Sequence, residues 1–282
     1  MKKILITGAG SYIGTSFENY LKNFGDEYSV DTVDMIDGSW KEKSFSGYDA
    51  VFHVAGIVHK KETNENVSQY YAVNRDLTVE VAKKAKNEGV RQFVFLSSMS
   101  VYGIVTGRIT AGTEPKPKSN YGESKLQAER KISEMNDDLF KVCVLRPPMI
   151  YGKGCKGNYK VLRKLAIKLK VFPYVKNERS MLFIDNLCEF VRLMIDNVES
   201  GSFFPQNDEY VNTSAMVQEI AKANGKKIRL MHGTAWAVKL LSIISTKAKK
   251  AFGTLTYDKS MSVYEQPYNV VSHSDSVLRT EK

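Results

Sequence analysis

The stretch Thr7-Gly8-Ala9-Gly10-Ser11-Tyr12-Ile13-Gly14 decides the fold, because it joins a short apolar segment to an amphipathic one. The apolar run Ile4 to Ile6 precedes it, and apolar residues at helical spacing continue to Phe24. Glycines between a strand and a helix let the backbone approach a pyrophosphate, which then lies on the free N–H groups of the helix. The residues predicted to bind phosphate are Gly8, Gly10, Ser11, Tyr12, Ile13 and Gly14.

A second strand is predicted from Tyr28 to Asp34, and its last residue stands 20 positions after Gly14. A carboxylate at about this distance from the glycine turn accepts hydrogen bonds from the adenosine ribose of a dinucleotide. Asp31 and Asp37 are alternatives for this role. No basic residue follows Asp34 before position 41, and a carboxylate would repel a 2′-phosphate. NAD is therefore favoured over NADP.

Strands and helices alternate along roughly the first 200 residues. Further strands are predicted at 50–54, 92–96, 140–145 and 181–184, and further helices at 67–88, 121–135, 158–169 and 185–197. This order predicts an α/β fold, a Rossmann-type doubly wound parallel sheet covered on both faces. The dinucleotide-binding domain is predicted at 1–152, with part of 181–198 added to it. A small, interleaved C-terminal substrate lobe is predicted mainly at 153–282.

The remaining third of the chain carries a weaker pattern. Helices are predicted at 213–223 and 234–251, whereas 253–282 is rich in Ser and Thr and gives no clear periodic signal.

A tyrosine and a lysine stand four residues apart, Tyr121 and Lys125, and therefore share one face of a predicted helix. The strand 92–96 runs into Ser97 and Ser98, so hydroxyl groups lie at the carboxyl end of a strand, where ligands bind in doubly wound sheets. A phenol is a poor base at neutral pH, but a nearby ammonium group and an oxidised nicotinamide both favour its phenolate. This set predicts acid–base chemistry on a substrate hydroxyl.

Taken together, the motifs resemble the extended short-chain dehydrogenases/reductases of the NAD-dependent epimerase/dehydratase family, which modify nucleotide-diphosphate sugars. The resemblance runs from Met1 to about Asn197. It is carried by the glycine turn, by Asp49-Ala50-Val51-Phe52-His53-Val54-Ala55-Gly56, by Asn74, by Ser97-Ser98 and Val101-Tyr102-Gly103, by the Tyr121 helix, and by Leu145-Arg146-Pro147-Pro148-Met149-Ile150-Tyr151-Gly152.

By this resemblance each candidate residue acquires a role. Tyr121 is implied as the catalytic acid/base, Lys125 as its partner and nicotinamide-ribose ligand, and Ser98 as the hydroxyl that orients the substrate. Ala55, Gly56 and Pro148 are implied to contact the cofactor, and Asn74 to be structural. Arg179 is implied to bind the substrate diphosphate, with Asn158 as the weaker second candidate. The family's middle glycine is Ser11 here, and Met149 stands where the family often has a substrate-contacting Asn.

Dehydrating members of the family carry an Asp-Glu pair directly after the orienting hydroxyl, and this chain has Met99 and Ser100 there. Neither residue can shuttle the protons that dehydration requires. The reaction expected first is 4-epimerisation of a UDP-sugar through a transient 4-keto intermediate. The alternative is NAD(P)H-dependent reduction of a UDP-4-keto-(6-deoxy)-sugar. A non-catalytic dinucleotide sensor is a remote alternative, since such proteins commonly lack the Tyr-Lys pair.

The formal charge of +10 is concentrated in one half of the chain. Residues 1–150 carry a net charge of +1 and residues 151–282 one of +9, mostly in two basic blocks at 153–179 and 222–250. A doubly charged sugar diphosphate explains this position better than nucleic acid does, and much of the excess is expected to be solvated surface. The segment 236–250 is interpreted as a packed helix, in preference to a helix lying on a membrane.

Cysteine and histidine usage supports neither disulfides nor a metal site. Cys143, Cys155 and Cys188 share no C-x-x-C spacing, and the four histidines lack metal-ligand spacing. His53, on an apolar strand, is predicted to be a hydrogen-bonded core residue. Cytoplasmic localisation fits this pattern, with no stretch apolar enough to span a membrane. The resemblance also implies a homodimer, in contact through the helices predicted at 67–88 and 121–135.

Overall fold

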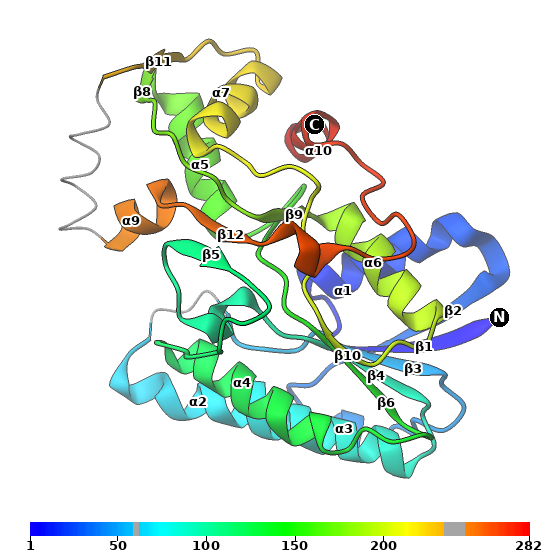
Figure 1. Cartoon of the computed structure of the whole chain (residues 1–282). Coiled ribbons are helices and arrows are strands. Elements are labelled where there is room, and N and C mark those ends of the chain that lie inside the picture. Colours follow the sequence, from blue (N-terminus) through cyan, green and yellow to red (C-terminus); the bar gives the residue numbers. More distant parts are fainter. Residues whose placement is uncertain (59–61, 234–245) are drawn as a thin grey trace. The chain divides into compact units, whose positions relative to one another are not determined.

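The computed structural model describes residues 1–58, 62–233 and 246–282. The described chain forms two compact units (Figure 1). The sheet unit comprises Met1–Gly103, Glu114–Pro147 and Leu187–Pro205. The second unit comprises Ile104–Thr113, Pro148–Asn186 and Gln206–Lys282. The chain thus passes between the units several times. The sequence prediction placed 1–152 with part of 181–198 in one domain and mainly 153–282 in an interleaved lobe. What each part binds stays a prediction.

The sheet unit is built on six parallel strands in the order β10-β6-β4-β3-β1-β2. Every residue of the central strand β4 is buried, which is typical of parallel strands covered on both faces. The prediction of a doubly wound parallel sheet is therefore confirmed. The strands are β1 (Lys2–Thr7), β2 (Tyr28–Val33), β3 (Ala50–His53), β4 (Gln92–Leu96), β6 (Lys141–Leu145) and β10 (Gly201–Phe203).

Helices cover both faces of this sheet (Figure 1). On one face Phe17 of α1 packs edge-on against Phe52, with 5.2 Å between the ring centroids. On the other face the alternate side chains of the same strands, such as Phe93, form one buried cluster with Val81 and Ile132. The helices of the sheet unit are α1 (Tyr12–Leu21), α2 (Val67–Tyr71), α3 (Leu77–Asn87) and α4 (Asn120–Ser133), and α6 (Ile184–Asp196) contributes all but its first residues.

The helix predicted at 67–88 is interrupted. A π-helical turn at Ala72–Asp76 separates α2 from α3. Such turns insert one extra residue and are frequent at functional sites. Here the turn contains Asn74, whose side chain is fully buried. Spacing alone could not reveal the interruption, because the apolar positions on either side still fit a helix.

The second unit consists of short elements. Its strands pair in parallel as β5 (Gly107–Ile109) with β12 (Leu255–Tyr257), β7 (Met149–Tyr151) with β9 (Met181–Phe183), and β8 (Val171–Pro173) with β11 (Arg229–Met231). Its helices are α5 (Asn158–Lys168), α7 (Thr213–Ala223), α9 (Thr246–Phe252) and α10 (His273–Glu281). Within the described residues, no helix is both long and apolar enough to cross a membrane.

Two predictions for the last third need comment. Most of the helix predicted at 234–251 lies outside the described residues, and only α9 falls within them. The segment 253–282, which gave no periodic signal, contains β12 and α10. These elements escaped notice because β12 has three residues and α10 has nine, with Ser276, Val277 and Thr280 as its buried side. Two of those three side chains are polar.

Candidate active site

The glycine turn between β1 and α1 needs glycine at two points. Gly8 and Gly10 have φ values of +112° and +70°, which L-residues with side chains rarely adopt. A Cβ on Gly8 would lie 3.0 Å from the backbone nitrogen of Ala55. Ser11, which replaces the family's middle glycine, caps α1 by accepting a hydrogen bond from Gly14 N at 3.2 Å. The cradle is therefore open to a pyrophosphate at the N-terminus of α1.

The strand that ends in Asp34 is attached directly to this turn. The N–H groups of Gly8 and Ala9 donate to Val33 O at 2.9 and 3.1 Å. Asp34 is the next residue, and it is exposed. Its position beside the phosphate cradle is the one that an adenosine ribose ligand requires. The turn and this carboxylate therefore fit NAD.

The two competing aspartates are occupied by local contacts. Asp31 lies inside β2 and accepts a 2.5 Å hydrogen bond from the hydroxyl group of Tyr48. Asp37 accepts hydrogen bonds from both the backbone N–H and the hydroxyl of Ser39. These bonds lower the pKa of Asp37. Asp34 also accepts a local hydrogen bond, from Ile36 N at 2.8 Å, so what favours it for the ribose is its position directly after β2, beside the glycine turn.

Lys125 is buried in the centre of the sheet unit. Its Nζ donates to Leu96 O, at the end of β4, over 2.9 Å and lies 4.5 Å from the ring centroid of Phe95. Burial lowers the pKa of Lys125 to about 7, and Glu129 opposes this change. Lys125 is thus held against the carboxyl end of β4 with a proton that it can lose near neutral pH.

Tyr121 is the second residue of α4, and the helix approaches the serine turn closely because Gly122 follows it. A Cβ on Gly122 would lie 2.6 Å from Ser100 O. This approach brings Ser98 within hydrogen-bonding distance of the Tyr121 hydroxyl. The turn itself is fixed, because Ser98 Oγ accepts from Ser100 N at 3.1 Å. The structure therefore brings Ser98 and Tyr121 together.

The pKa of Tyr121 is raised, with burial as the largest cause. The hydrogen bond from Ser98 lowers it, and the charge of Tyr70 raises it further. Sequence reasoning expected the Lys125 ammonium group to favour the phenolate, but burial outweighs any such effect. The reason is that both groups lie in a region of low dielectric constant, where each charged form is disfavoured. The Tyr121 phenol is accordingly a proton donor in the protein alone.

Sequence reasoning missed Glu62, which holds the first turn of α4. One carboxylate oxygen accepts from the backbone N–H and the side-chain amide of Asn120, both at 3.1 Å. The other oxygen accepts from Tyr121 N at 3.1 Å. Ser119 caps the same helix by accepting from Gly122 N. A carboxylate at a helix N-terminus satisfies free N–H groups and complements the helix dipole.

The buried Asn74 fixes the segment that follows Gly56. Its Oδ1 accepts from Ile57 N at 2.7 Å, while its Nδ2 donates to Ile57 O and to Ser124 Oγ at 3.1 and 3.2 Å. A Cβ on Gly56 would lie 3.0 Å from this Oδ1 and 3.3 Å from the Nζ of Lys125. Only glycine fits here without displacing them. Asn74 therefore has a structural role beside Lys125.

His53 lies fully buried between two threonines, as predicted for a core residue. Its Nδ1 is 2.7 Å from Thr7 Oγ1, and its Nε2 is 3.0 Å from Thr78 Oγ1. Because Thr78 donates its own proton to Asn74 O, it must accept one from Nε2, so Nδ1 accepts from Thr7. Burial and the charge of Lys125 lower the pKa of His53 to about 3, so the ring is neutral.

A buried ion pair supports the carboxyl ends of β4 and β6. Arg146 contacts Glu129 of α4 with an Nη2–Oε2 distance of 2.6 Å, and its Nη1 donates to the Tyr102 hydroxyl at 2.9 Å. Ser97 also donates to Glu129. This cluster joins α4 to the strands that present Ser98.

The candidate residues for substrate diphosphate belong to the second unit. Arg179 is half-buried and donates from Nη1 to Gly253 O at 2.9 Å. Burial lowers its pKa, and no carboxylate in the described part of the chain forms an ion pair with it. Asn158 is exposed at the start of α5, and Pro148 is buried just before β7. Since these three lie in the second unit, their proximity to Tyr121 stays a prediction.

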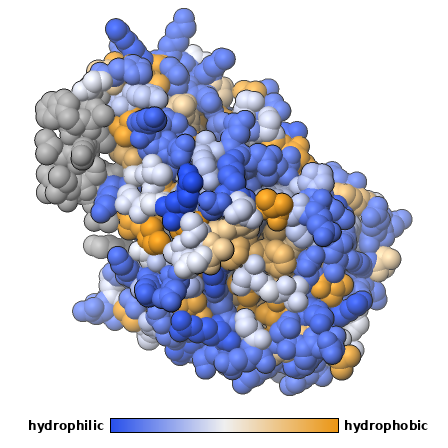
Figure 2. All heavy atoms as spheres, in the orientation of Figure 1, coloured by the Kyte–Doolittle hydropathy of each residue, from blue (hydrophilic) through white to orange (hydrophobic). Residues whose placement is uncertain are grey.

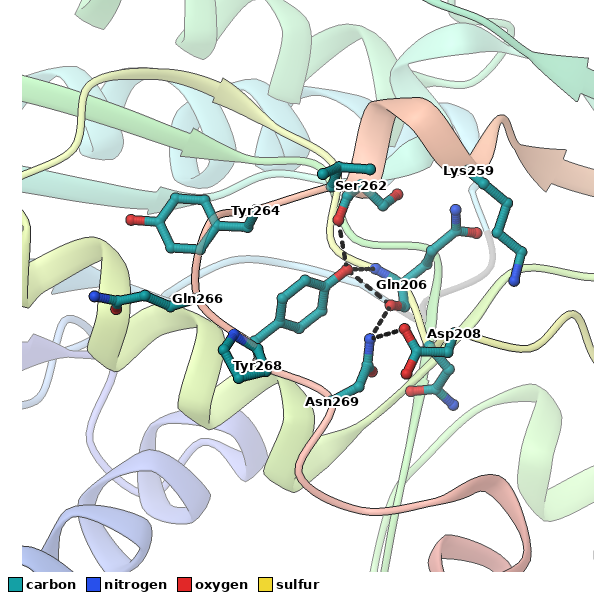
Figure 3. A pocket seen from close by; sticks show the side chains of 11 residues that line it. Gln206, Asp208, Lys259, Ser262, Tyr264, Gln266, Tyr268 and Asn269 are labelled. Carbon is teal, nitrogen blue, oxygen red and sulfur yellow. Dashed lines mark hydrogen bonds between the residues drawn. The ribbon is translucent and has the colours of Figure 1, made fainter.

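A pocket within the second unit contains none of these candidates among its described lining residues (Figure 3). The hydroxyl of Tyr268 lies 2.9 Å from Gln206 O and 3.0 Å from Ser262 O. Asn269 donates to Gln206 O and to Asp208 at 3.2 and 2.9 Å. These bonds tie the segment before α10 to the segment before α7. We assign them a structural role.

A parallel six-stranded sheet, a glycine turn beside Asp34, and a Tyr-x-x-x-Lys helix with a neighbouring serine define the class of short-chain dehydrogenases/reductases. The model of the NAD dependent epimerase/dehydratase family matches residues 4–205. The chain belongs to this family.

Its relatives include sugar epimerases. The chain is 28% identical over 288 residues to the UDP-glucose 4-epimerase of Vibrio cholerae, covering 92% of this chain and 88% of that one. It is 25% identical over 317 residues to the N-acetyl-alpha-D-glucosaminyl-diphospho-ditrans,octacis-undecaprenol 4-epimerase of Escherichia coli O157:H7, covering 99% and 95%. The structure of UDP-glucuronic acid 4-epimerase from Bacillus cereus in complex with NAD has a TM-score of 0.74, at 20% identity, covering 99% and 95%.

Proposed function

We propose that this protein is an NAD-dependent 4-epimerase of a sugar carried on a diphosphate. One observation carries the proposal: a phosphate cradle adjoining Asp34 occurs in the same unit as Tyr121, Ser98 and a buried Lys125. NAD, when bound, supplies reversible removal of hydrogen from the sugar carbon. Gly8, Gly10 and the N-terminus of α1 would hold its pyrophosphate, Asp34 its adenosine ribose, and Ala55, Gly56 and Pro148 are proposed to line its site.

Within this proposal the chain's own residues manage the proton. Tyr121, converted to its phenolate by loss of the phenol proton to solvent, takes the proton of the C4 hydroxyl as the carbon is oxidised and returns it when the carbon is reduced on the opposite face. Ser98 orients the sugar hydroxyl and stabilises the phenolate through its hydrogen bond. Lys125, with a pKa of about 7, holds the nicotinamide ribose and gains its full charge as the phenolate forms nearby. The same residues would serve a 4-keto reductase.

We propose that Arg179, assisted by Asn158, binds the diphosphate. A half-buried guanidinium group without a carboxylate partner in the described residues offers several donors to phosphate oxygens. The carrier beyond the diphosphate is open between a nucleoside and a polyprenyl group, since the relatives in Vibrio cholerae and Escherichia coli differ in this respect. A UDP-sugar is proposed first.

The experiment supplies UDP-sugars, and the corresponding 4-keto sugars, with either trace NAD or one equivalent of NAD(P)H. An epimerase interconverts the 4-epimers without net change in cofactor. A reductase consumes one NAD(P)H per 4-keto sugar. A dinucleotide sensor binds NAD and does neither.

The test variant is Tyr121→Phe, which should lower kcat about 10²- to 10⁴-fold. The control is Tyr28→Phe. Tyr28 is the first residue of β2, at the other end of that strand from Asp34, and its hydroxyl donates to Asp196 at 2.7 Å. Full activity of Tyr121→Phe would exclude the proposed mechanism, whichever reaction is found.

We further propose that the protein acts in the cytoplasm as a homodimer. Its three cysteines are free thiols, which fits a reducing compartment. The proposed contact uses the helical segment predicted at 67–88, which comprises α2, the π-helical turn and α3, together with α4. Light scattering on the wild-type chain and on Lys131→Glu, an exposed position on α4, tests it: a monomeric wild type would exclude the dimer.

A further inference from the structure

The outer side of α5 carries a stripe of lysines. Lys160, Lys164 and Lys168 stand four residues apart, so they lie on one face over successive turns. All three are exposed, and Val161 beside them is 55% exposed. The opposite side of the helix is buried through Tyr159, Leu162 and Ala166.

The ribbon that follows α5 continues this surface. Leu169 and Val171 are 41% and 45% exposed, and Lys170 between them is exposed. In the parallel register Val171 is paired with Arg229, and Met231, two residues on, is 38% exposed. The ribbon thus exposes both aliphatic side chains and cations. Figure 2 shows hydrophilic and hydrophobic side chains side by side at the end of the molecule that carries β8 and β11.

We call this the basic–apolar surface. Its cations are Lys160, Lys164, Lys168, Lys170, Lys226, Lys227 and Arg229, and its aliphatic residues are Val161, Leu169, Val171 and Met231. No acidic residue occurs in the stretches 153–177 and 220–233. Among the described residues, none of these cations forms an ion pair, whereas the nearby Glu281 is paired with Arg163. The charge of the surface is therefore uncompensated.

We propose that the basic–apolar surface docks on an anionic lipid bilayer. Lysines attract anionic headgroups, and exposed aliphatic side chains between them gain free energy by entering the headgroup region. Isolated lysines would suit a solvated surface, but four partly exposed aliphatic residues gathered among the lysines are typical of a contact surface. Single-stranded nucleic acid would require open aromatic platforms. The rings next to this surface, Tyr174 and His232, lie against each other with 4.5 Å between their centroids. Two copies would repel each other through their like charges.

The test measures partition of the full chain onto vesicles by flotation. Vesicles of phosphatidylcholine with about one-third phosphatidylglycerol should bind the protein, and pure phosphatidylcholine vesicles should not. The charge variant combines Lys164→Gln, Lys168→Gln and Lys170→Gln. Each lysine near an anionic surface contributes roughly a fivefold factor, so the partition coefficient should fall about 100-fold. High salt should produce a similar loss.

The matched control removes the same charge from exposed lysines of the sheet unit, through Lys3→Gln, Lys22→Gln and Lys41→Gln. Its partition coefficient should stay within about threefold of wild type. A third variant, Leu169→Ser with Met231→Ser, keeps the charge and should still lose binding about tenfold. Circular dichroism and NAD binding confirm that each variant is folded.

Two results would overturn the inference. One is no binding of the wild type to the anionic vesicles, whether or not the protein binds a DNA or RNA duplex instead. The other is equal loss of vesicle binding in the charge variant and its control. Neither of these outcomes bears on the sugar assay, because no residue of the basic–apolar surface belongs to the proposed active site.

Discussion

Substitution of Glu62 by Gln removes the charge that holds the start of α4 while keeping its shape. Glu62 accepts three hydrogen bonds, each 3.1 Å long, from Asn120 and Tyr121. A glutamine keeps one accepting oxygen, so it loses at least one of these bonds and the favourable interaction with the helix dipole. The residue that carries the proposed proton transfer is itself one of the donors.

The expected free-energy loss can be worked from these contacts. A hydrogen bond to a charged group contributes about 1.5–3 kcal/mol, and half-exposure of Glu62 reduces this value. The interaction with the helix dipole adds about 0.3–1 kcal/mol. We expect a total loss of about 1–2 kcal/mol. If this whole loss of free energy acts on the reactive position of Tyr121, kcat decreases about 5- to 30-fold.

The assay separates placement from folding. Steady-state kinetics of Glu62→Gln should show a lower kcat with KM for the sugar nearly unchanged, and the melting temperature should fall by only a few degrees. Glu65→Gln is the control, because Glu65 is an exposed acidic residue three positions along the same segment. The reasoning is refuted if Glu62→Gln and Glu65→Gln have equal kcat, or if KM alone changes.

Three further predictions concern other residues of the sheet unit. Lys125→Met should abolish activity yet raise the melting temperature at pH 7. The pKa of Lys125 in the folded protein, about 7, lies below its value in the unfolded chain, so burial of the charged lysine destabilises the fold at low pH, and this destabilisation shrinks as the pH rises through 7 towards 10. A pH series of melting curves checks this. Asp34→Ser should lower the preference for NAD over NADP about tenfold in binding titrations, and an unchanged ratio would favour Asp31. Arg146→Met should cost about 3–5 kcal/mol in urea unfolding, because it leaves Glu129 charged, buried and without its cation; a loss below about 1 kcal/mol would show that the pair is not needed.

The parallel sheet was predictable because local signals agreed along the chain. The strand predicted at 92–96 coincides with β4, whose residues are all apolar except Gln92, and the helix predicted at 213–223 coincides with α7. The glycine turn and Asp34 followed from spacing, since both lie within one β-α-β unit. Short elements such as β8 were missed, because three residues are too few to show a period.

The residues of the candidate site were predictable only where they lie close to one another in the sequence. Tyr121 and Lys125 share one helix face, so four-residue spacing revealed them. Glu62 reaches α4 from a position 59 residues away from Tyr121, and no local pattern indicates such a contact. The downward shift in the pKa of Lys125 also required the fold, since burial is its main cause.

The neutral ring of His53 has a consequence for how the protein responds to acid. With a pKa of about 3 and hydrogen bonds on both nitrogens, it adds no charge between about pH 4 and 8. It also links Thr7, which ends the strand before the glycine turn, to Thr78, which binds the carbonyl of Asn74. The hydrogen bonds of His53 thus connect the strand that precedes the cofactor cradle with the helical segment beside Lys125. Mild acidity would leave these hydrogen bonds intact, so a loss of activity near neutrality would not come from protonation of His53.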